Sequence, residues 1–105
     1  MENQIPAYFI FDVKINDPEL LKPYQEKVEA SYKLYGGTLL ILGGNAETVE
    51  GKEPDGIFVM LRFDSREQAK AWHSSPEYQA IIHHRHAAAK THAWLVDGVP
   101  ETPTK

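Results

Sequence analysis

The chain has 105 residues, of which 42% are hydrophobic and 25% charged, so it is long enough for one globular domain and too rich in core-forming residues to be disordered. Its longest apolar runs are four residues and no charged-then-apolar leader opens the chain, which argues against a membrane-spanning helix and predicts a cytoplasmic protein. It contains no cysteine and its net charge is −4, so thiolate chemistry is excluded and nucleic acid is not an expected partner.

The N-terminal third predicts a strand followed by a helix. Apolar side chains alternate over residues 7–15, which is the pattern of a strand. Asp17 followed by Pro18 is a typical helix start, and Gly36-Gly37 is a typical helix end. Pro23 lacks a backbone N–H, so we expect either a separate first turn or a helix that begins near Lys22.

Two strands are predicted in the middle of the chain. Residues 38–42 form the first. Gly43-Gly44-Asn45 indicates a bulge or kink, after which residues 46–50 could continue the strand. Residues 57–63 form the second. Both strands are apolar on both faces, whereas an antiparallel sheet with one solvated face alternates apolar and polar residues. The sheet therefore needs a cover on its second face, and we expect a second copy of the chain to supply it.

The C-terminal part predicts two helices and a last strand. Two overlapping capping boxes, Asp64 with Glu67 and Ser65 with Gln68, predict the start of a short helix that ends at about His73. Ser75-Pro76 begins a second helix that runs to Ala89, and residues 91–97 read as a strand.

The order of these elements is β-α-β-β-α-β, which predicts an α+β fold of the ferredoxin-like type. In that fold a four-stranded antiparallel sheet carries its helices on one face. We expect one domain over residues 1–98, a flexible C-terminal tail over residues 99–105, and a homodimer that packs sheet face to sheet face.

Several motifs also carry a resemblance to a known family. They are the glycines of Tyr35-Gly36-Gly37, Gly43-Gly44 and Glu50-Gly51, Phe63 with Ser65, the run Ala71-Trp72-His73-Ser74-Ser75-Pro76-Glu77-Tyr78 with Arg85 seven residues later, and Val96-Asp97-Gly98. Over about residues 5–98 the chain resembles the domain-of-unknown-function 1330 family of the dimeric α+β barrel superfamily. The resemblance implies the fold and the dimer but no activity, because the superfamily includes cofactor-free monooxygenases, lactone isomerases and haem-binding relatives.

Arg85 is the first candidate for a functional residue. It shares a helix face with Tyr78 and apolar residues, so its guanidinium is expected near the core, where it needs an anionic partner. One interpretation is an anchor for an acidic small molecule. The other is an internal ion pair with Asp12 or Glu77, or an arginine stem that extends to water.

Aromatic residues on the helices are the next candidates. Tyr78, Tyr32 and Trp72, with Tyr24, either line a ligand pocket or simply fill the core. His73 is adjacent to Trp72 and is the candidate general base, and hence the candidate catalytic residue.

Metal binding and cofactor use are not expected. His83 and His86 lie three residues apart, a spacing that can share a metal, but they fall away from the Tyr78–Arg85 face and are expected to face water. The glycine spacing fits neither a phosphate loop nor a dinucleotide fingerprint.

Two functional hypotheses follow from the sequence. The first is a small-molecule pocket between the helices and the sheet, with or without catalysis, in which Arg85 holds an acidic or aromatic ligand. The second is a non-catalytic dimeric interaction module.

Overall fold

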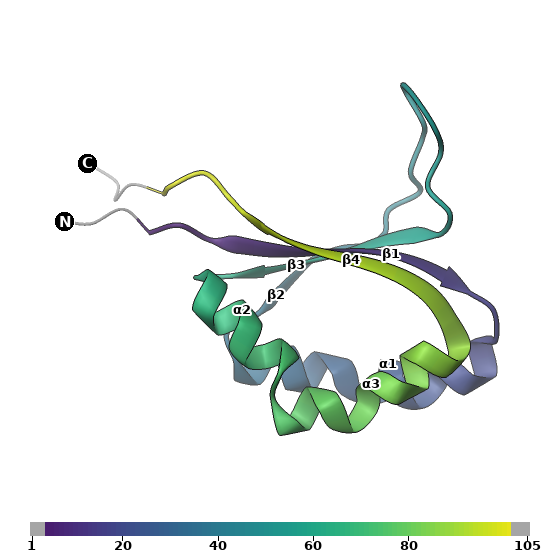
Figure 1. The fold of residues 1–105 in the computed structure, drawn as a ribbon, viewed down its shortest axis with the longest axis horizontal. Coiled ribbons are helices and arrows are strands. Elements are labelled where there is room, and N and C mark those ends of the chain that lie inside the picture. Colours follow the sequence, from purple (N-terminus) through teal and green to yellow (C-terminus); the bar gives the residue numbers. More distant parts are fainter. Residues whose placement is uncertain (1–3, 102–105) are drawn as a thin grey trace.

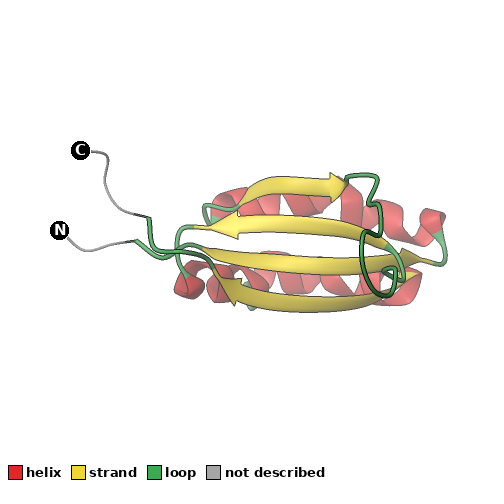
Figure 2. Cartoon of the chain, turned by 90° about the horizontal axis from the view of Figure 1, so that it is seen from above, coloured by secondary structure: helices red, strands yellow, loops and turns green. Residues whose placement is uncertain are grey.

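The computed structural model describes residues 4–101. They form β1 (Ala7–Ile15), α1 (Pro18–Leu34), β2 (Thr38–Gly43), β3 (Ile57–Phe63), α2 (Arg66–His73), α3 (Pro76–Ala88) and β4 (Ala89–Asp97). The strands make one antiparallel sheet in the order β2-β3-β1-β4, and all three helices lie on the same face of it (Figures 1 and 2). This arrangement confirms the predicted ferredoxin-like α+β fold.

The helices begin where their capping residues predict. The Asp17 carboxylate accepts hydrogen bonds from the backbone N–H groups of Glu19 and Leu20 at the start of α1. The Ser65 hydroxyl accepts from the N–H of Gln68, and the Ser75 hydroxyl accepts from the N–H of Tyr78. Each cap satisfies N–H groups that have no partner within the helix, so it fixes the helix start.

Two details of the sequence-based prediction are wrong. Helix α1 is continuous from Pro18 to Leu34 and passes through Pro23, so there is neither a separate first turn nor a late start at Lys22. Pro23 lies in the second turn, where it removes one hydrogen bond only, and the tertiary packing of the helix outweighs that loss. Residues 46–50 do not continue a strand, because Gly43, Gly44 and Asn45 all adopt positive φ and turn the chain away from the sheet.

A β-bulge lies inside β2 rather than at its glycines. Leu39 pairs with Leu61 and Ile41 pairs with Met60, so Leu40 is an extra residue without a partner on β3. The bulge changes which face the following residues occupy. As a result Leu39 and Leu42, although three positions apart, both lie on the helix side of the sheet.

Aromatic side chains dominate the core between the sheet and the helices. Phe9 contacts the rings of Phe63 and Trp72, and the Trp72 ring lies 4.1 Å from that of Tyr78, centroid to centroid. Phe63, Trp72 and Tyr78 are fully buried. This cluster fixes α2 and the first turns of α3 against β1 and β3.

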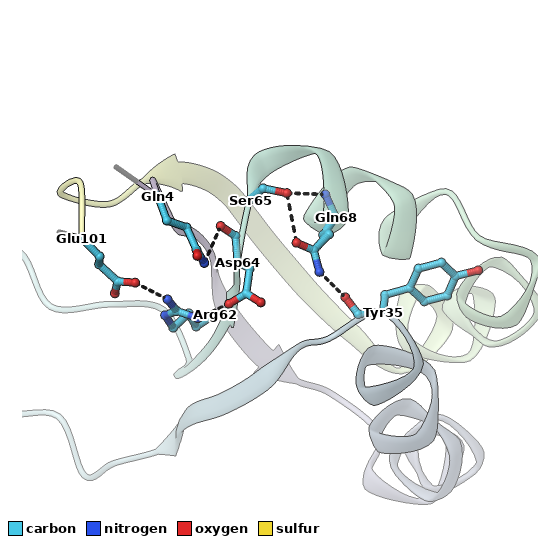
Figure 3. A network of polar contacts seen from close by, with 7 residues as sticks. All are labelled: Gln4, Tyr35, Arg62, Asp64, Ser65, Gln68 and Glu101. Atoms are coloured by element: carbon cyan, nitrogen blue, oxygen red, sulfur yellow. Dashed lines mark hydrogen bonds and ion pairs between the residues drawn. The ribbon is translucent and has the colours of Figure 1, made fainter. Parts of the chain in front are cut away.

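Polar contacts tie the two ends of the described chain to β3. Gln4 and Glu101 pair through their backbones, and the Arg62 guanidinium contacts the carboxylates of Asp64 at 2.7 Å and Glu101 at 2.6 Å (Figure 3). The domain boundary at residue 98 and the flexible tail over 99–105 stay predictions; of that tail, residues 102–105 lie outside the described residues. In residues 4–101 no helix has the length and apolarity needed to cross a bilayer.

Candidate functional site

A cavity of about 380 Å³ lies between α1 and the helix side of the sheet. It exists because α1 packs along α3 rather than directly on β2 and β3. Most of the wall is apolar, and its residues come from five elements: Phe11, Val13 and Ile15 of β1; Leu21, Tyr24, Gln25, Val28, Glu29 and Tyr32 of α1; Leu39 and Leu42 of β2; Ile57, Val59 and Leu61 of β3; and Arg85 of α3.

Part of this apolar wall is open to water. Leu42 is 69% exposed, and Leu39 and Ile57 are exposed as well. Exposed leucines scattered singly are ordinary, but these three border one cavity. A cavity of this size and composition is typical of small-molecule sites.

Arg85 is the only cationic side chain in the wall, and it is only 6% exposed. Its guanidinium carbon lies 5.5 Å from the centre of the Phe11 ring and 5.7 Å from that of Tyr24. Nη2 donates a long hydrogen bond of 3.3 Å to the Tyr78 hydroxyl. The Nε–H is buried and has no hydrogen-bond partner in the described part of the chain.

Neither predicted internal ion pair of Arg85 forms. The Asp12 carboxylate accepts hydrogen bonds from the backbone N–H groups of Asp55 and Gly56, and Glu77 accepts one from the Tyr35 hydroxyl. Across residues 4–101 no carboxylate lies within ion-pair distance of the guanidinium. Arg85 is therefore a buried cation that is balanced only by aromatic rings and one hydroxyl.

Two tyrosines extend this polar end of the cavity. The Tyr24 and Tyr78 hydroxyl oxygens are 2.7 Å apart. Burial, followed by the neighbouring Tyr78, raises the pKa of Tyr24 well above its usual value, so its hydroxyl stays protonated at ordinary pH. Tyr24 lines the cavity, whereas Tyr78 is fully buried behind it. Tyr32 lines the wall farther along α1.

Trp72 and His73 lie outside the cavity wall. The Trp72 indole N–H donates to the Ser31 hydroxyl at 3.0 Å within the core. The His73 ring stacks on Phe9 and lies 5.4 Å from the Tyr78 ring, centroid to centroid. Burial, with smaller effects of the positive charges on α3, lowers the pKa of His73 below its ordinary 6.5, which favours the neutral imidazole at pH 7.

The remaining histidines form no site with a third ligand. The His83 and His84 rings are 3.9 Å apart, centroid to centroid, on the outside of α3. In the part of the chain that the structure describes, no three His, Asp or Glu side chains lie close enough together to hold a metal ion.

Of the residues predicted for a ligand site, the structure brings Arg85 and Tyr78 into contact, while Tyr32 lines the same cavity farther along α1. Sequence reasoning missed that Tyr24 links the cavity to Tyr78 and Arg85. The helical spacing of Tyr24 and Val28 puts both on the buried stripe of α1, but no sequence signal tells that Tyr24 faces α3.

The family profile described as a domain of unknown function, DUF1330, matches residues 6–99. No curated protein sequence matches the chain. Among solved structures, the chain is similar to RPA0582, a protein of unknown function from Rhodopseudomonas palustris. The TM-score is 0.70 at 15% identity, and the match covers 93% of this chain and 85% of that one. It is also similar to SnoaB, a cofactor-independent oxygenase from Streptomyces nogalater, with a TM-score of 0.57 at 12% identity and coverage of 98% and 100%.

Identities this low establish the fold and carry no activity across. The profile match, in contrast, spans nearly the whole described chain, from residue 6 to residue 99. The protein therefore belongs to the DUF1330 family.

Proposed function

We propose that the protein binds a small, mostly apolar molecule with an acidic group in the cavity beneath the sheet, and that Arg85 is the charged anchor. The observation that carries this proposal is the buried Arg85 guanidinium without a carboxylate partner. Burying a cation without an anion costs several kcal/mol. A ligand that brings its own anionic group removes that cost on binding, and its apolar body covers the exposed leucines.

The other predicted site residues have supporting roles in this proposal. Tyr78 orients the guanidinium through its hydroxyl, Tyr32 provides part of the wall, and Trp72 holds Tyr78 in place. Catalysis by His73 stays a prediction. Its ring contacts the Tyr78 ring rather than the cavity, so any proton transfer from His73 to a ligand needs an intervening group.

Decanoate is a suitable probe, because 380 Å³ holds about a dozen water-sized groups at roughly 30 Å³ each. Isothermal titration is expected to show binding to the wild-type protein. Arg85→Gln is expected to weaken binding by about ten- to a hundredfold, the worth of a charge-assisted hydrogen bond. Arg66→Gln is the matched control, since Arg66 pairs with Asp97 outside the cavity. Absence of decanoate binding, or equal binding by Arg85→Gln, contradicts the proposal.

We also propose that two copies associate through the outer face of the sheet, the side opposite the helices. The register places Ile41, Met60, Ile10 and Trp94 in one row across all four strands of this face. Of its three charged residues on the central strands, Asp12 and Arg62 already have partners within the chain, and Lys14 is exposed near the end of β1. A second copy can therefore cover the middle of the face without burying an unpaired charge, while Lys14 and Lys90 lie together at one end of it.

The outer face is complementary to itself. Trp94, on the edge strand β4, is 50% exposed. On the other half of the sheet, a hollow of about 430 Å³ is lined by Ile10, Ile41, Phe58 and Met60 among others. A two-fold axis parallel to the strands places the Trp94 indole of each copy over the hollow of the other, because both lie in the same row.

The size of the face also suits a dimer. Four strands about 4.8 Å apart and about eight residues long span roughly 500 Å² as a flat area, to which protruding side chains add. A standard interface buries about 800 Å² per partner. The loop of residues 44–56 rises from the same side at one end and adds to this surface (Figure 1).

Sedimentation velocity tests the assembly. The wild-type protein is expected to be a dimer at micromolar concentration and Trp94→Glu a monomer, while Leu34→Glu, on the helix side, leaves the dimer intact. A monomeric wild-type protein at high concentration contradicts the proposal. A dimer that binds no probe favours the non-catalytic interaction module.

A further inference from the structure

The direction of the hydrogen bonds around Arg85 identifies a second donor in the cavity. A guanidinium can only donate, so the Tyr78 oxygen accepts from Nη2. Tyr78 has a single hydroxyl proton, and the Tyr24 oxygen at 2.7 Å is its only hydrogen-bond partner besides Arg85 among residues 4–101. If Tyr24 donated to Tyr78 instead, the Tyr78 proton would be left unpaired in the core. The favoured direction therefore runs from Arg85 to Tyr78 to Tyr24.

This direction leaves the Tyr24 proton without an acceptor in the chain. Tyr24 lines the cavity, and the two polar side chains beside its hydroxyl in the described residues, Tyr78 and Arg85, both act as donors toward it. The polar end of the cavity thus presents two kinds of donor, the guanidinium N–H groups of Arg85 and the O–H of Tyr24. The only carboxylate in the wall, that of Glu29, pairs with Lys33 at 2.9 Å.

We infer that Tyr24 is a ligand-binding donor and that, with Arg85, it makes the cavity selective for apolar monocarboxylates. A carboxylate has two acceptor oxygens, so one can accept from the guanidinium and the other from the Tyr24 hydroxyl. An alcohol or phenol has a neutral oxygen, which accepts weaker hydrogen bonds than a carboxylate does and brings a proton of its own among donors. An amide brings an NH₂ group against donors, where it has nothing to bind. This inference rests on the proposed function and deepens it.

The raised pKa of Tyr24 agrees with this assignment, because a tyrosine that keeps its proton remains a donor beside a carboxylate. The charge count agrees as well. One buried cation and one neutral hydroxyl match a single negative charge, whereas a dianion would bring a second charge that has no cation in the wall.

Calorimetric titration of two probes, decanoate and decan-1-ol, tests the inference. Tyr24→Phe is expected to weaken decanoate binding by about tenfold or more, since a hydrogen bond to a charged group is lost. It should change decan-1-ol binding less than about threefold, because a hydrogen bond to a neutral oxygen contributes less than one to a carboxylate. Tyr35→Phe is the matched control, as it removes a tyrosine hydrogen bond outside the cavity.

The outcomes separate this inference from the proposed function. If Tyr24→Phe binds decanoate as wild type does while Arg85→Gln does not, the role of Tyr24 is refuted and the pocket stands. If wild-type protein binds decan-1-ol as tightly as decanoate, carboxylate selectivity is refuted. If it binds neither, the proposed function fails and this inference with it. Binding of decan-1-ol by Tyr24→Phe with wild-type affinity also shows that the variant is folded.

Discussion

Arg85→Met is expected to stabilise the folded protein while it abolishes binding of an acidic ligand. Methionine retains most of the apolar stem but removes the charged guanidinium, whose carbon lies over the rings of Phe11 and Tyr24. If the guanidinium serves ligand binding rather than folding, its burial lowers the stability of the ligand-free protein. Removing the guanidinium should then raise the free energy of unfolding and abolish ligand binding in the same variant.

The magnitude follows from the contacts of the guanidinium. The substitution loses one long hydrogen bond to Tyr78, worth about 1 kcal/mol, and two contacts with aromatic faces, worth about 0.5–1 kcal/mol each. It recovers the burial cost of the cation and of its unpaired Nε–H, together about 4 kcal/mol beside a water-accessible cavity. The net gain is about 1–2 kcal/mol in the free energy of unfolding. For a domain of this size, each kcal/mol raises Tm by roughly 4–8 °C.

Urea unfolding followed by circular dichroism measures this difference, with an unchanged m-value as evidence of the same transition. Arg62→Met is the control of opposite sign. Arg62 holds two carboxylates, so its loss should destabilise the protein by up to about 1 kcal/mol per ion pair. A loss of more than about 1 kcal/mol in Arg85→Met would refute the reasoning, because it would mean that the guanidinium stabilises the fold by itself.

Three further predictions concern the scaffold. Asp12→Ala should cost about 2–4 kcal/mol in urea unfolding, because the backbone N–H groups of Asp55 and Gly56 lose a charged acceptor; a loss below about 0.5 kcal/mol would show that this tether is dispensable. Gly56→Ala should cost about 3 kcal/mol or more, since the added Cβ overlaps the carbonyl of Val13, and near-wild-type stability would contradict that packing. The lowered pKa of His73 predicts that stability falls as pH drops through 6.5, because the unfolded chain then binds the proton more readily. His73→Phe should flatten that profile, and an equally steep profile would assign the effect to other groups.

The sequence predicts the elements of this fold well where local signals and packing agree. Strand β1 has the predicted bounds, and the caps at Asp17, Ser65 and Ser75 begin the helices as predicted. It fails where tertiary structure overrides a local rule. Pro23 lies inside a continuous helix. The turn expected at Gly43-Gly44-Asn45 ends the strand, so residues 46–50 leave the sheet instead of continuing it.

The site is harder to predict than the fold. Helical spacing puts Arg85 on the same face as Tyr78, but it does not tell which acid reaches the guanidinium. Asp12 and Glu77 are both plausible partners in sequence, and each is engaged elsewhere in three dimensions. The position of His73 beside Phe9 likewise depends on how α2 is oriented on the sheet, which no local pattern specifies.

The bulge at Leu40 determines whether strand β2 can lose a residue without changing which side chains face the cavity. A residue inserted into a regular strand sends every later side chain to the opposite face. In β2 this would move side chains of the cavity wall to the outer face of the sheet, and the reverse. Leu40 is 48% exposed and unpaired, and its neighbours Leu39 and Ile41 already occupy alternate faces. Deleting Leu40 would restore plain alternation and keep Leu42 in the cavity. Edge strand β2 can therefore shorten by one residue at Leu40 while the cavity wall and the outer face keep their present side chains.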